Sequence, residues 1–267
     1  MKFKRNGVGE APTRPLPIRQ RNPANQESFS KGARRVVLGG VFERRERWSL
    51  TPTGWIALLL AVALMFGLVV WRVHPFLAVT DRVDSQLLVV EGWIPNYALE
   101  ESLSEFKAKP YGLIFTVGCD ILTGVNVEAG DNQATYAAKR LVWLGMNPKL
   151  VQPVPSPTQY RNRSYASAVA LREWVEQHRL SVTSFNLVTV GVHARRSRLL
   201  FQKAFGNNVH IGVIAVQDRE YDPGRWWRSS EGVKEVISES AGYLYARLFF
   251  HPQASATETA TIKRGGG

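Results

Sequence analysis

The hydrophobic pattern of the chain is dominated by one long run near the N-terminal end. From Leu50 to Trp71 there are 22 residues without a charged side chain. As a helix this run would be about 33 Å long, enough to cross the roughly 30 Å hydrocarbon core of a bilayer. Trp55 and Trp71 lie near its two ends, where indole rings favour the headgroup region. The pattern predicts a transmembrane helix over residues 50–72.

Two other interpretations of this run are a buried core helix and a cleaved signal peptide. A core helix rarely lacks a polar face over such a length. A signal peptide has an apolar region of about 7–15 residues followed by a small-residue cleavage site. The segment after Trp71, RVHPFLAVT, has no such site. An uncleaved anchor is therefore favoured, followed by a linker over residues 73–84.

Beyond the linker, the apolar residues form short uninterrupted runs. Runs without polar alternation are typical of strands that are buried on both faces of a parallel sheet. The predicted strands are Leu87–Val90, Leu113–Val117, Leu150–Val154, Asn186–Val190 and Ile211–Val216.

Segments with helical spacing of apolar residues alternate with these runs. They are Tyr97–Ala108, Asn132–Leu144, Arg163–His178, Arg195–Phe205 and Ser229–Phe250. This alternation predicts an α/β fold with a three-layer, doubly wound, mainly parallel (Rossmann-like) sheet. We expect one such domain over residues 85–250, preceded by a single transmembrane helix, and a disordered tail over residues 251–267.

Positive charge is concentrated before the apolar run. The chain has a net charge of +12, and residues 1–48 hold twelve basic and four acidic side chains. This segment has no helical or strand period, so residues 1–49 are predicted to be a largely disordered basic tail. The positive-inside rule predicts a cytoplasmic tail and an extracytoplasmic domain. The lipid bilayer is therefore an expected partner of the protein, and nucleic acid is not.

Common catalytic signatures are missing from the sequence. It contains no G-x-x-x-x-G-K-[ST], G-x-G-x-x-G, G-x-S-x-G or H-E-x-x-H motif. This argues against a nucleotide motor, a conventional dinucleotide enzyme, a serine hydrolase of that type and a zinc protease. The single cysteine, Cys119, excludes an intrachain disulfide. No metal site is predicted, and the cofactor and the oligomeric state stay open.

Polar residues follow the predicted strands at the edge where doubly wound sheets bind ligands. The three segments at this edge are Glu91-Gly92-Trp93, Gly118-Cys119-Asp120 and Gly191-Val192-His193-Ala194-Arg195-Arg196. A glycine there either lets the backbone approach a ligand or makes a tight turn. We expect Glu91 or Asp120 to act as acid or base and His193 to assist proton transfer, with Gly92, Trp93 and Gly118 in contact with substrate.

Five arginines near predicted helix starts are candidates for binding an anion. They are Arg161, Arg163, Arg195, Arg196 and Arg198. Guanidinium groups and helix N-termini both favour phosphate. Because some of these side chains can instead face solvent or lipid headgroups, we expect two or three of them to face a common pocket.

The last predicted helix and the segment before it leave two questions open. Trp227 and its neighbour Trp226 can form a stacking wall or an interfacial anchor. Glu231 is a candidate for the edge of the site, with Lys234 and Glu239 as weaker candidates. Charges on a helix are more often a solvated face, and that is the alternative for all three.

Five sequence blocks also carry a resemblance. The chain resembles the YdcF/SanA/ElyC-like family, a bacterial domain of unknown function, from about Asp84 to Phe250. The blocks, in order, are LLVVEGWIP, LIFTVGCD, RNRSYASAVALREWV, NLVTVGVHARRSRLLFQKAF and RWWRSSEGVKEVISE.

The resemblance implies a Rossmann-like domain tethered to the bacterial inner membrane and facing the periplasm. It also implies a role in envelope integrity or in cell-wall and lipid-carrier metabolism, and it places Ser164 in the substrate-binding set. The chain departs from the family after the first two predicted strands, because Glu91-Gly92-Trp93 and Gly118-Cys119-Asp120 stand where the family usually has paired glycines.

Two functional hypotheses follow. One is an envelope enzyme that acts on a phosphate-bearing substrate, such as a lipid-linked or cell-wall precursor. The other is a noncatalytic ligand-sensing or scaffolding factor for envelope integrity. Both agree with a single-pass anchor.

Overall fold

The computed structural model describes residues 36–37, 42–43, 50–120, 132–157 and 161–252. The chain forms two compact units, Met1–Leu58 and Leu59–Gly267. Within the first unit, strands β1 (Val36–Val37) and β2 (Phe42–Glu43) form a short antiparallel pair, which the predicted disordered tail did not anticipate. The rest of that tail, residues 1–35, 38–41 and 44–49, and the C-terminal tail from residue 253 lie outside the described residues.

The predicted apolar helix is present as α1 (Pro52–Leu77). It is the one helix in the described part of the chain that is long and apolar enough to cross a membrane, and its most apolar window is not buried. The helix continues five residues beyond the predicted end at Arg72. Leu77 is buried in a cluster with Val192 and Trp226, and this packing extends the helix into the predicted linker.

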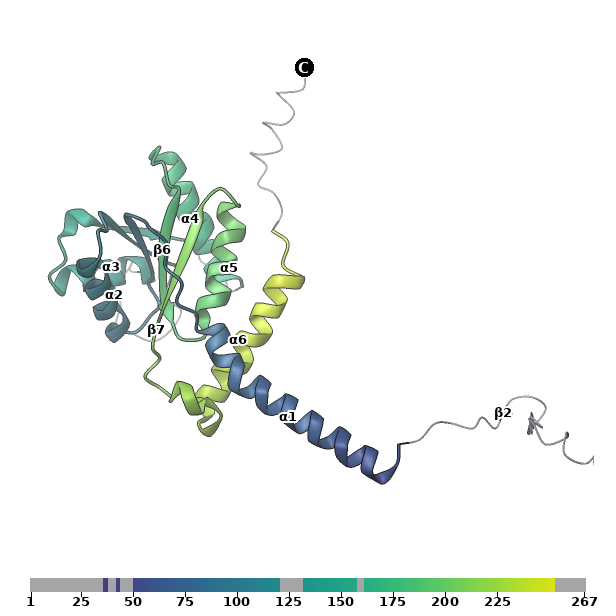
Figure 1. The fold of residues 1–267 in the computed structure, drawn as a ribbon. Helices are drawn as coiled ribbons and strands as arrows, with labels where there is room; N and C mark the ends of the chain where they lie inside the picture. Colours follow the sequence, from purple (N-terminus) through teal and green to yellow (C-terminus); the bar gives the residue numbers. More distant parts are fainter. Residues whose placement is uncertain (1–35, 38–41, 44–49, 121–131, 158–160, 253–267) are drawn as a thin grey trace, which may run out of the picture. The chain divides into compact units, whose positions relative to one another are not determined.

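A five-stranded parallel sheet confirms the predicted fold class (Figure 1). Its spatial order is β5-β4-β3-β6-β7. The strands are β3 (Leu87–Glu91), β4 (Leu113–Gly118), β5 (Val151–Pro155), β6 (Ser184–Val190) and β7 (His210–Val216). Each strand lies within two residues of its predicted position, because uninterrupted apolar runs are buried on both faces of the sheet.

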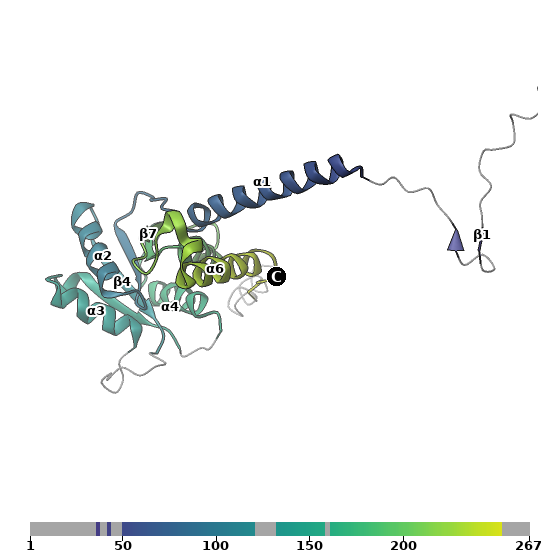
Figure 2. The ribbon, with the colours of Figure 1, turned by 90° about the horizontal axis from the view of Figure 1, so that it is seen from below.

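Helices cover both faces of the sheet and make it the middle of three layers (Figure 2). On one face, α2 (Asn96–Ala108) and α3 (Gln133–Trp143) share a buried apolar cluster with alternate residues of β3, β4 and β6. On the other face, α4 (Arg163–Gln177) and α5 (His193–Phe205) pack against the intervening residues of the same strands. The two clusters are the core of the domain.

A third apolar cluster joins the C-terminal end of α1 to the two helices that follow β7. The short 3-10 helix η3 (Pro223–Arg228) and helix α6 (Ser230–Leu248) follow β7, while another short turn, η2 (Pro148–Leu150), precedes β5. The cluster contains Leu77, Val192, Tyr221, Trp226 and Val236. The predicted linker also joins the domain, because Asp81 forms an antiparallel bridge with Val213 of the edge strand β7.

The strand order defines where a ligand can bind. The chain starts at β3, adds β4 and β5 on one side, and then returns to add β6 and β7 on the other. Connections on the two sides diverge at β3 and β6, so a crevice forms beyond their carboxyl ends. Glu91 ends β3 and His193 follows β6.

Candidate functional site

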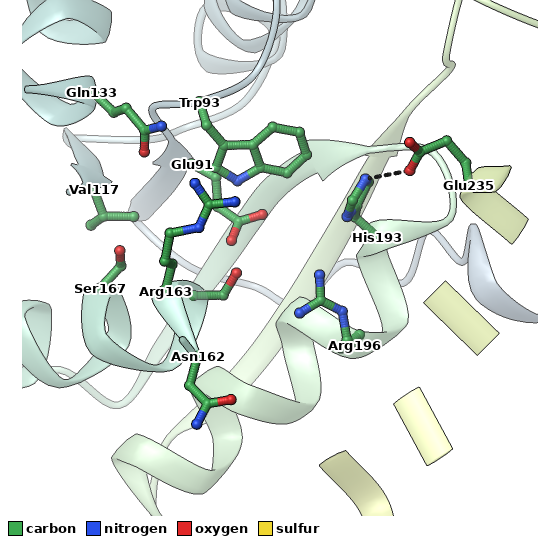
Figure 3. Close-up of a pocket in the computed structure, with 11 residues that line it drawn as sticks. Glu91, Trp93, Val117, Gln133, Asn162, Arg163, Ser167, His193, Arg196 and Glu235 are labelled. Carbon is green, nitrogen blue, oxygen red and sulfur yellow. Dashed lines mark ion pairs between the residues drawn. The ribbon is translucent and has the colours of Figure 1, made fainter. Parts of the chain in front are cut away.

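A cavity of about 380 Å³ lies at this switch point (Figure 3). Figure 3 shows Glu91, Trp93 and Arg163 on one side of the space and His193, Arg196 and Glu235 on the other. The lining residues are Glu91, Trp93, Val117, Gln133, Asn162, Arg163, Ser164, Ser167, His193, Arg196 and Glu235. Most of them are polar, and both signs of charge are present.

Glu91 is the carboxylate at the base of the cavity. It is the last residue of β3, and only 1% of it is exposed. The hydroxyl of Ser197 on α5 donates a hydrogen bond to its Oε2, at 3.0 Å. A buried carboxylate needs such partners because burial without them is costly. The hydrogen bond orients the carboxylate relative to the cavity.

His193 lies between two carboxylates of α6. Its Nε2 is 3.2 Å from Glu235 and its Nδ1 is 3.0 Å from Glu239. Burial favours the neutral imidazole, but the two carboxylates outweigh it and raise the pKa of His193 to about 9. His193 is therefore a cation at neutral pH.

Glu239 is held by a second cation as well. Arg196 donates hydrogen bonds to both carboxylate oxygens of Glu239, from Nε at 2.6 Å and from Nη2 at 2.9 Å. Burial by itself raises the pKa of Glu239, yet His193 and Arg196 lower it to about 2. Gly242 gives the Arg196 stem its close path past α6, because a Cβ there would lie 3.0 Å from Arg196 Cδ. The cluster of His193, Arg196, Glu235 and Glu239 is called the α5–α6 ion cluster below.

Three helices begin at the cavity. The first residues of α3, α4 and α5 are Gln133, Arg163 and His193, and all three line it. The N-terminus of a helix carries a partial positive charge and unpaired N–H groups, which together favour an anion. Asn162 precedes α4 in a left-handed conformation (φ 54°, ψ 38°), which asparagine tolerates better than most residues.

An aromatic wall closes one side of the site. The ring of Trp93 meets that of His193 edge-on, with 4.7 Å between the ring centres. Trp93 remains 37% exposed, so its ring is accessible from solvent. Such a ring can pack against an apolar or cyclic part of a ligand.

Six of the predicted site residues come together at the cavity. Two of the five candidate arginines, Arg163 and Arg196, are among them, which agrees with the expected two or three. The six are Glu91, Trp93, Arg163, Ser164, His193 and Arg196.

The other predicted polar residues lie elsewhere. Arg195 donates to the carbonyl of Phe76 and stacks over its ring, while Arg198 pairs with Asp81 at 2.7 Å. Both side chains therefore contact the segment that was predicted to be a linker, residues 73–84. Arg161, Trp227 and Glu231 are exposed and do not line the cavity.

Asp120 is also outside the cavity lining. It is exposed and forms a backbone bridge with Asn132. Of the two residues predicted as alternative acid–base groups, Glu91 lines the cavity and Asp120 does not.

Gly92 and Gly118 have a packing role. A Cβ at Gly92 would overlap the backbone carbonyl of Gln133, and one at Gly118 would overlap the Gln133 side chain. These two glycines let the start of α3 approach the strand ends. Neither glycine, for which substrate contact was predicted, lines the cavity, whereas Gln133 does.

Sequence reasoning missed part of the site. Gln133, Asn162, Ser167 and Val117 line the cavity without having been predicted, as does Glu235. The interpretation of Glu239 as part of a solvated helix face was wrong, since the residue is only 4% exposed. The spacing of Glu235 and Glu239, one helical turn apart, was the available signal that both face the same side.

The described residues contain no group of three or more histidine, cysteine or acidic side chains arranged to hold a metal ion. A buried carboxylate, a charged imidazole and two guanidinium groups can bind an anion and move protons.

Comparison with known proteins found no match, whether among protein-family models, curated proteins or solved structures. The fold and the site by themselves define the class: an α/β protein with a Rossmann-like parallel sheet, a polar cavity at the topological switch point, and one helix with the length and apolarity of a membrane span.

Proposed function

We propose that this protein is a membrane-anchored envelope enzyme of the YdcF/SanA/ElyC-like type, acting on a phosphate-bearing substrate such as a lipid-linked or cell-wall precursor. In this proposal α1 crosses the inner membrane of a bacterium and the domain lies outside the cytoplasm. The observation that carries the proposal is the convergence of three helix N-termini and Arg163 on a cavity that also contains a buried carboxylate.

In the proposed binding step, the positively charged groups of the cavity bind the phosphate of the substrate. Arg163 and the N-termini of α3, α4 and α5 hold the phosphate oxygens. Arg196 is already bonded to Glu239 through both oxygens, so its role is to keep Glu239 in place. Trp93 packs against the sugar or isoprenoid carbon next to the phosphate.

The proposed chemical step is transfer of the phosphoryl or glycosyl-phosphoryl group to water. Glu91 accepts a proton from the attacking water as its oxygen bonds to phosphorus. The bond from phosphorus to the leaving oxygen breaks. His193, charged at neutral pH, releases Glu235 and donates its Nε2 proton to that oxygen. Positioned acids and bases of this kind contribute about 10²–10⁴-fold each.

The test uses the full-length protein in nanodiscs with a polyprenyl-diphosphate saccharide. Wild type should release a phosphate-containing product that mass spectrometry identifies. Glu91→Gln and His193→Gln should each lower the rate by about 10²–10⁴-fold. Asp120→Asn, which changes a carboxylate outside the cavity, is the matched control and should leave the rate unchanged. Unchanged turnover in both Glu91→Gln and His193→Gln would rule out the catalytic mechanism.

The alternative is a noncatalytic ligand-sensing factor. It is favoured by the α5–α6 ion cluster, in which His193 and Arg196 already have carboxylate partners. A preformed, charge-balanced cavity suits binding without turnover. Under this alternative the same lipid binds to wild type, no product forms, and Arg163→Ala weakens binding.

The membrane topology has its own test. A phosphatase fused after residue 250 should be active in a bacterial host, because the reporter folds only outside the cytoplasm. The full-length protein should also remain in the pellet after carbonate washing of vesicles. An inactive fusion would reverse the orientation, and recovery in the supernatant would remove the anchor.

A further inference from the structure

Helix α6 has an apolar face that points away from the core. Its inward face carries the buried residues Val236, Glu239 and Ala246. The outward face carries an apolar row with the i, i+4, i+7, i+8, i+11 spacing of one helical face. This outer stripe of α6 consists of Ile237, Ala241, Leu244, Tyr245 and Leu248.

The outer stripe is open to the surroundings. Its four large side chains are each more than half exposed. The outward face of a helix on a soluble domain is normally polar, and a contiguous exposed apolar surface marks a binding site for a partner or a membrane. We therefore expect either a partner or a membrane to cover the outer stripe of α6.

The contacts between α1 and the end of the domain indicate which occupant this is. Trp226 in η3 donates its indole N–H to the carbonyl of Val70, at 3.2 Å. The ring of Tyr243 on α6 meets that of Phe76 edge-on, with 5.5 Å between centres. Val70 lies beside Trp71, where the uncharged run ends and the lipid–water boundary of a span would lie.

These contacts also show how α6 passes α1. On the side of η3 and α6, the contacting residues are as far apart as Trp226 and Tyr243. On the side of α1, all the contacts fall between Val70 and Ala78, at and just beyond its C-terminal end. If η3 and α6 ran alongside α1, they would contact a much longer part of it. The segment crosses α1 near its C-terminal end, as a helix lying along a membrane surface would cross a spanning helix.

The charges around the outer stripe favour an anionic surface. Between Asp222 and Leu248 four basic residues and two acidic residues are exposed. The basic ones are Arg225, Arg228, Lys234 and Arg247. Basic side chains near anionic headgroups strengthen the binding of a protein to an anionic membrane. Trp227, which is exposed beside them, is a residue type that prefers the interface.

We propose that α6 is an interfacial helix whose outer stripe lies among the headgroups and upper acyl chains of the leaflet from which α1 emerges. This proposal rests on α1 crossing the membrane. Amphipathic helices with aromatic and aliphatic residues on one face and flanking cations bind bilayers in this way. Because the inner face of α6 supplies Glu235 and Glu239, the cavity then lies about one helix diameter, ~10 Å, from the lipid.

The experiment measures the surroundings of a spin label at Leu244. Leu244→Cys is made in the full-length chain, labelled, and placed at one copy per nanodisc with anionic lipid. Leu60→Cys in α1 is the lipid reference, and Glu173→Cys on the exposed face of α4 is the aqueous reference. The unsubstituted chain is the labelling control, because its Cys119 is buried. Collision rates with oxygen and with a water-soluble nickel chelate report lipid and water, respectively.

The label at Leu244 should give an oxygen-to-nickel collision ratio several-fold above that at Glu173 and close to that at Leu60. A ratio equal to that at Glu173, with Leu60 in lipid, would overturn the interfacial helix and leave the anchor intact. Aqueous values at both Leu244 and Leu60 would mean that the anchor itself fails. Spin–spin broadening at Leu244 in larger discs holding two copies, together with an aqueous ratio, would assign the stripe to a second copy and overturn the proposal.

Discussion

Arg196 and Arg198 are two residues apart on α5, and each has a carboxylate within hydrogen-bond distance. The Arg196–Glu239 distance is 2.6 Å, and the two side chains are 24% and 6% exposed. The Arg198–Asp81 distance is 2.7 Å, but these side chains are 34% and 56% exposed. The nitrogen–oxygen distances of the two pairs are therefore nearly equal, whereas their exposure to solvent differs.

The difference in surroundings decides what each pair does. Water screens the charges of Arg198 and Asp81 whether or not they meet, so their pairing changes stability little. Arg196 and Glu239 have lost most of their hydration, so each depends on the other. Of the two arginines, the buried one is at the cavity, and the exposed one only ties the segment before the domain to α5.

The largest expected effect is that of Glu239→Ala. Removing this carboxylate leaves Arg196 and His193 buried without their shared partner, and breaking a buried pair in this way costs about 3–5 kcal/mol. Denaturant unfolding of the full chain in detergent, followed by tryptophan fluorescence, measures the loss. Asp81→Ala is the matched control for the exposed pair. A loss below about 1 kcal/mol for Glu239→Ala would contradict the importance of burial.

The pH dependence of stability is expected to follow from the same cluster. The pKa of His193, raised to about 9, means that its contribution is complete below about pH 6.5 and is lost as the pH rises through about 9. The pKa of Glu239, lowered to about 2, means that its contribution is complete above about pH 4.5 and is lost as the pH falls through about 2. At 1.36 kcal/mol per unit of pKa, the alkaline loss is about 3 kcal/mol.

Unfolding free energies from pH 6 to pH 10 measure this alkaline loss. His193→Gln should be less stable at pH 6 and should show a flatter alkaline limb than wild type. An equal slope in both proteins would show that another group titrates in this range.

A smaller effect is expected for Arg196→Lys. Lysine keeps the charge but cannot donate to both oxygens of Glu239 in one plane. Loss of one charge-assisted hydrogen bond costs about 1.5–3 kcal/mol. The same unfolding measurement should therefore place this variant between Glu239→Ala and wild type, and wild-type stability would show that the bidentate geometry is unimportant.

The smallest effect is expected for Arg198→Ala. An exposed pair contributes about 0.2–1 kcal/mol, and added salt should reduce this contribution further. Comparing unfolding at low and high salt tests both statements. A loss as large as that of Glu239→Ala would mean that the segment containing Asp81 is a structural requirement of the domain.

The sheet was predictable because each strand has a distinct local pattern. Runs such as Leu87–Val90 are apolar at consecutive positions, and only a strand covered on both faces buries such a run. The start of α5 was harder to place. It begins at His193, two residues before the predicted start. The sequence gives no local signal for this start, because the N-cap residue, Val192, has no polar side chain that could accept a hydrogen bond from the helix.

The site was predictable only where the sheet determines it. Glu91 and His193 follow strands, so the strand order brings them to one edge. Glu235 reaches the same cavity from α6, and Glu239 of α6 pairs with His193. This helix packs on α5 and on α1 and belongs to no strand connection. The charge pattern of α6 showed that these residues share a face, but the direction of that face depends on tertiary packing.

Pro75 lies within α1, two residues before its end at Leu77. A proline within a helix has no N–H, so the carbonyl of the residue four positions earlier, Trp71, receives no amide bond from it. In hydrocarbon an unbonded carbonyl costs several kcal/mol, whereas water satisfies it readily. If α1 crosses a membrane, as proposed, the proline limits how deeply the helix can lie in the hydrocarbon, because the carbonyl of Trp71 must remain within reach of water.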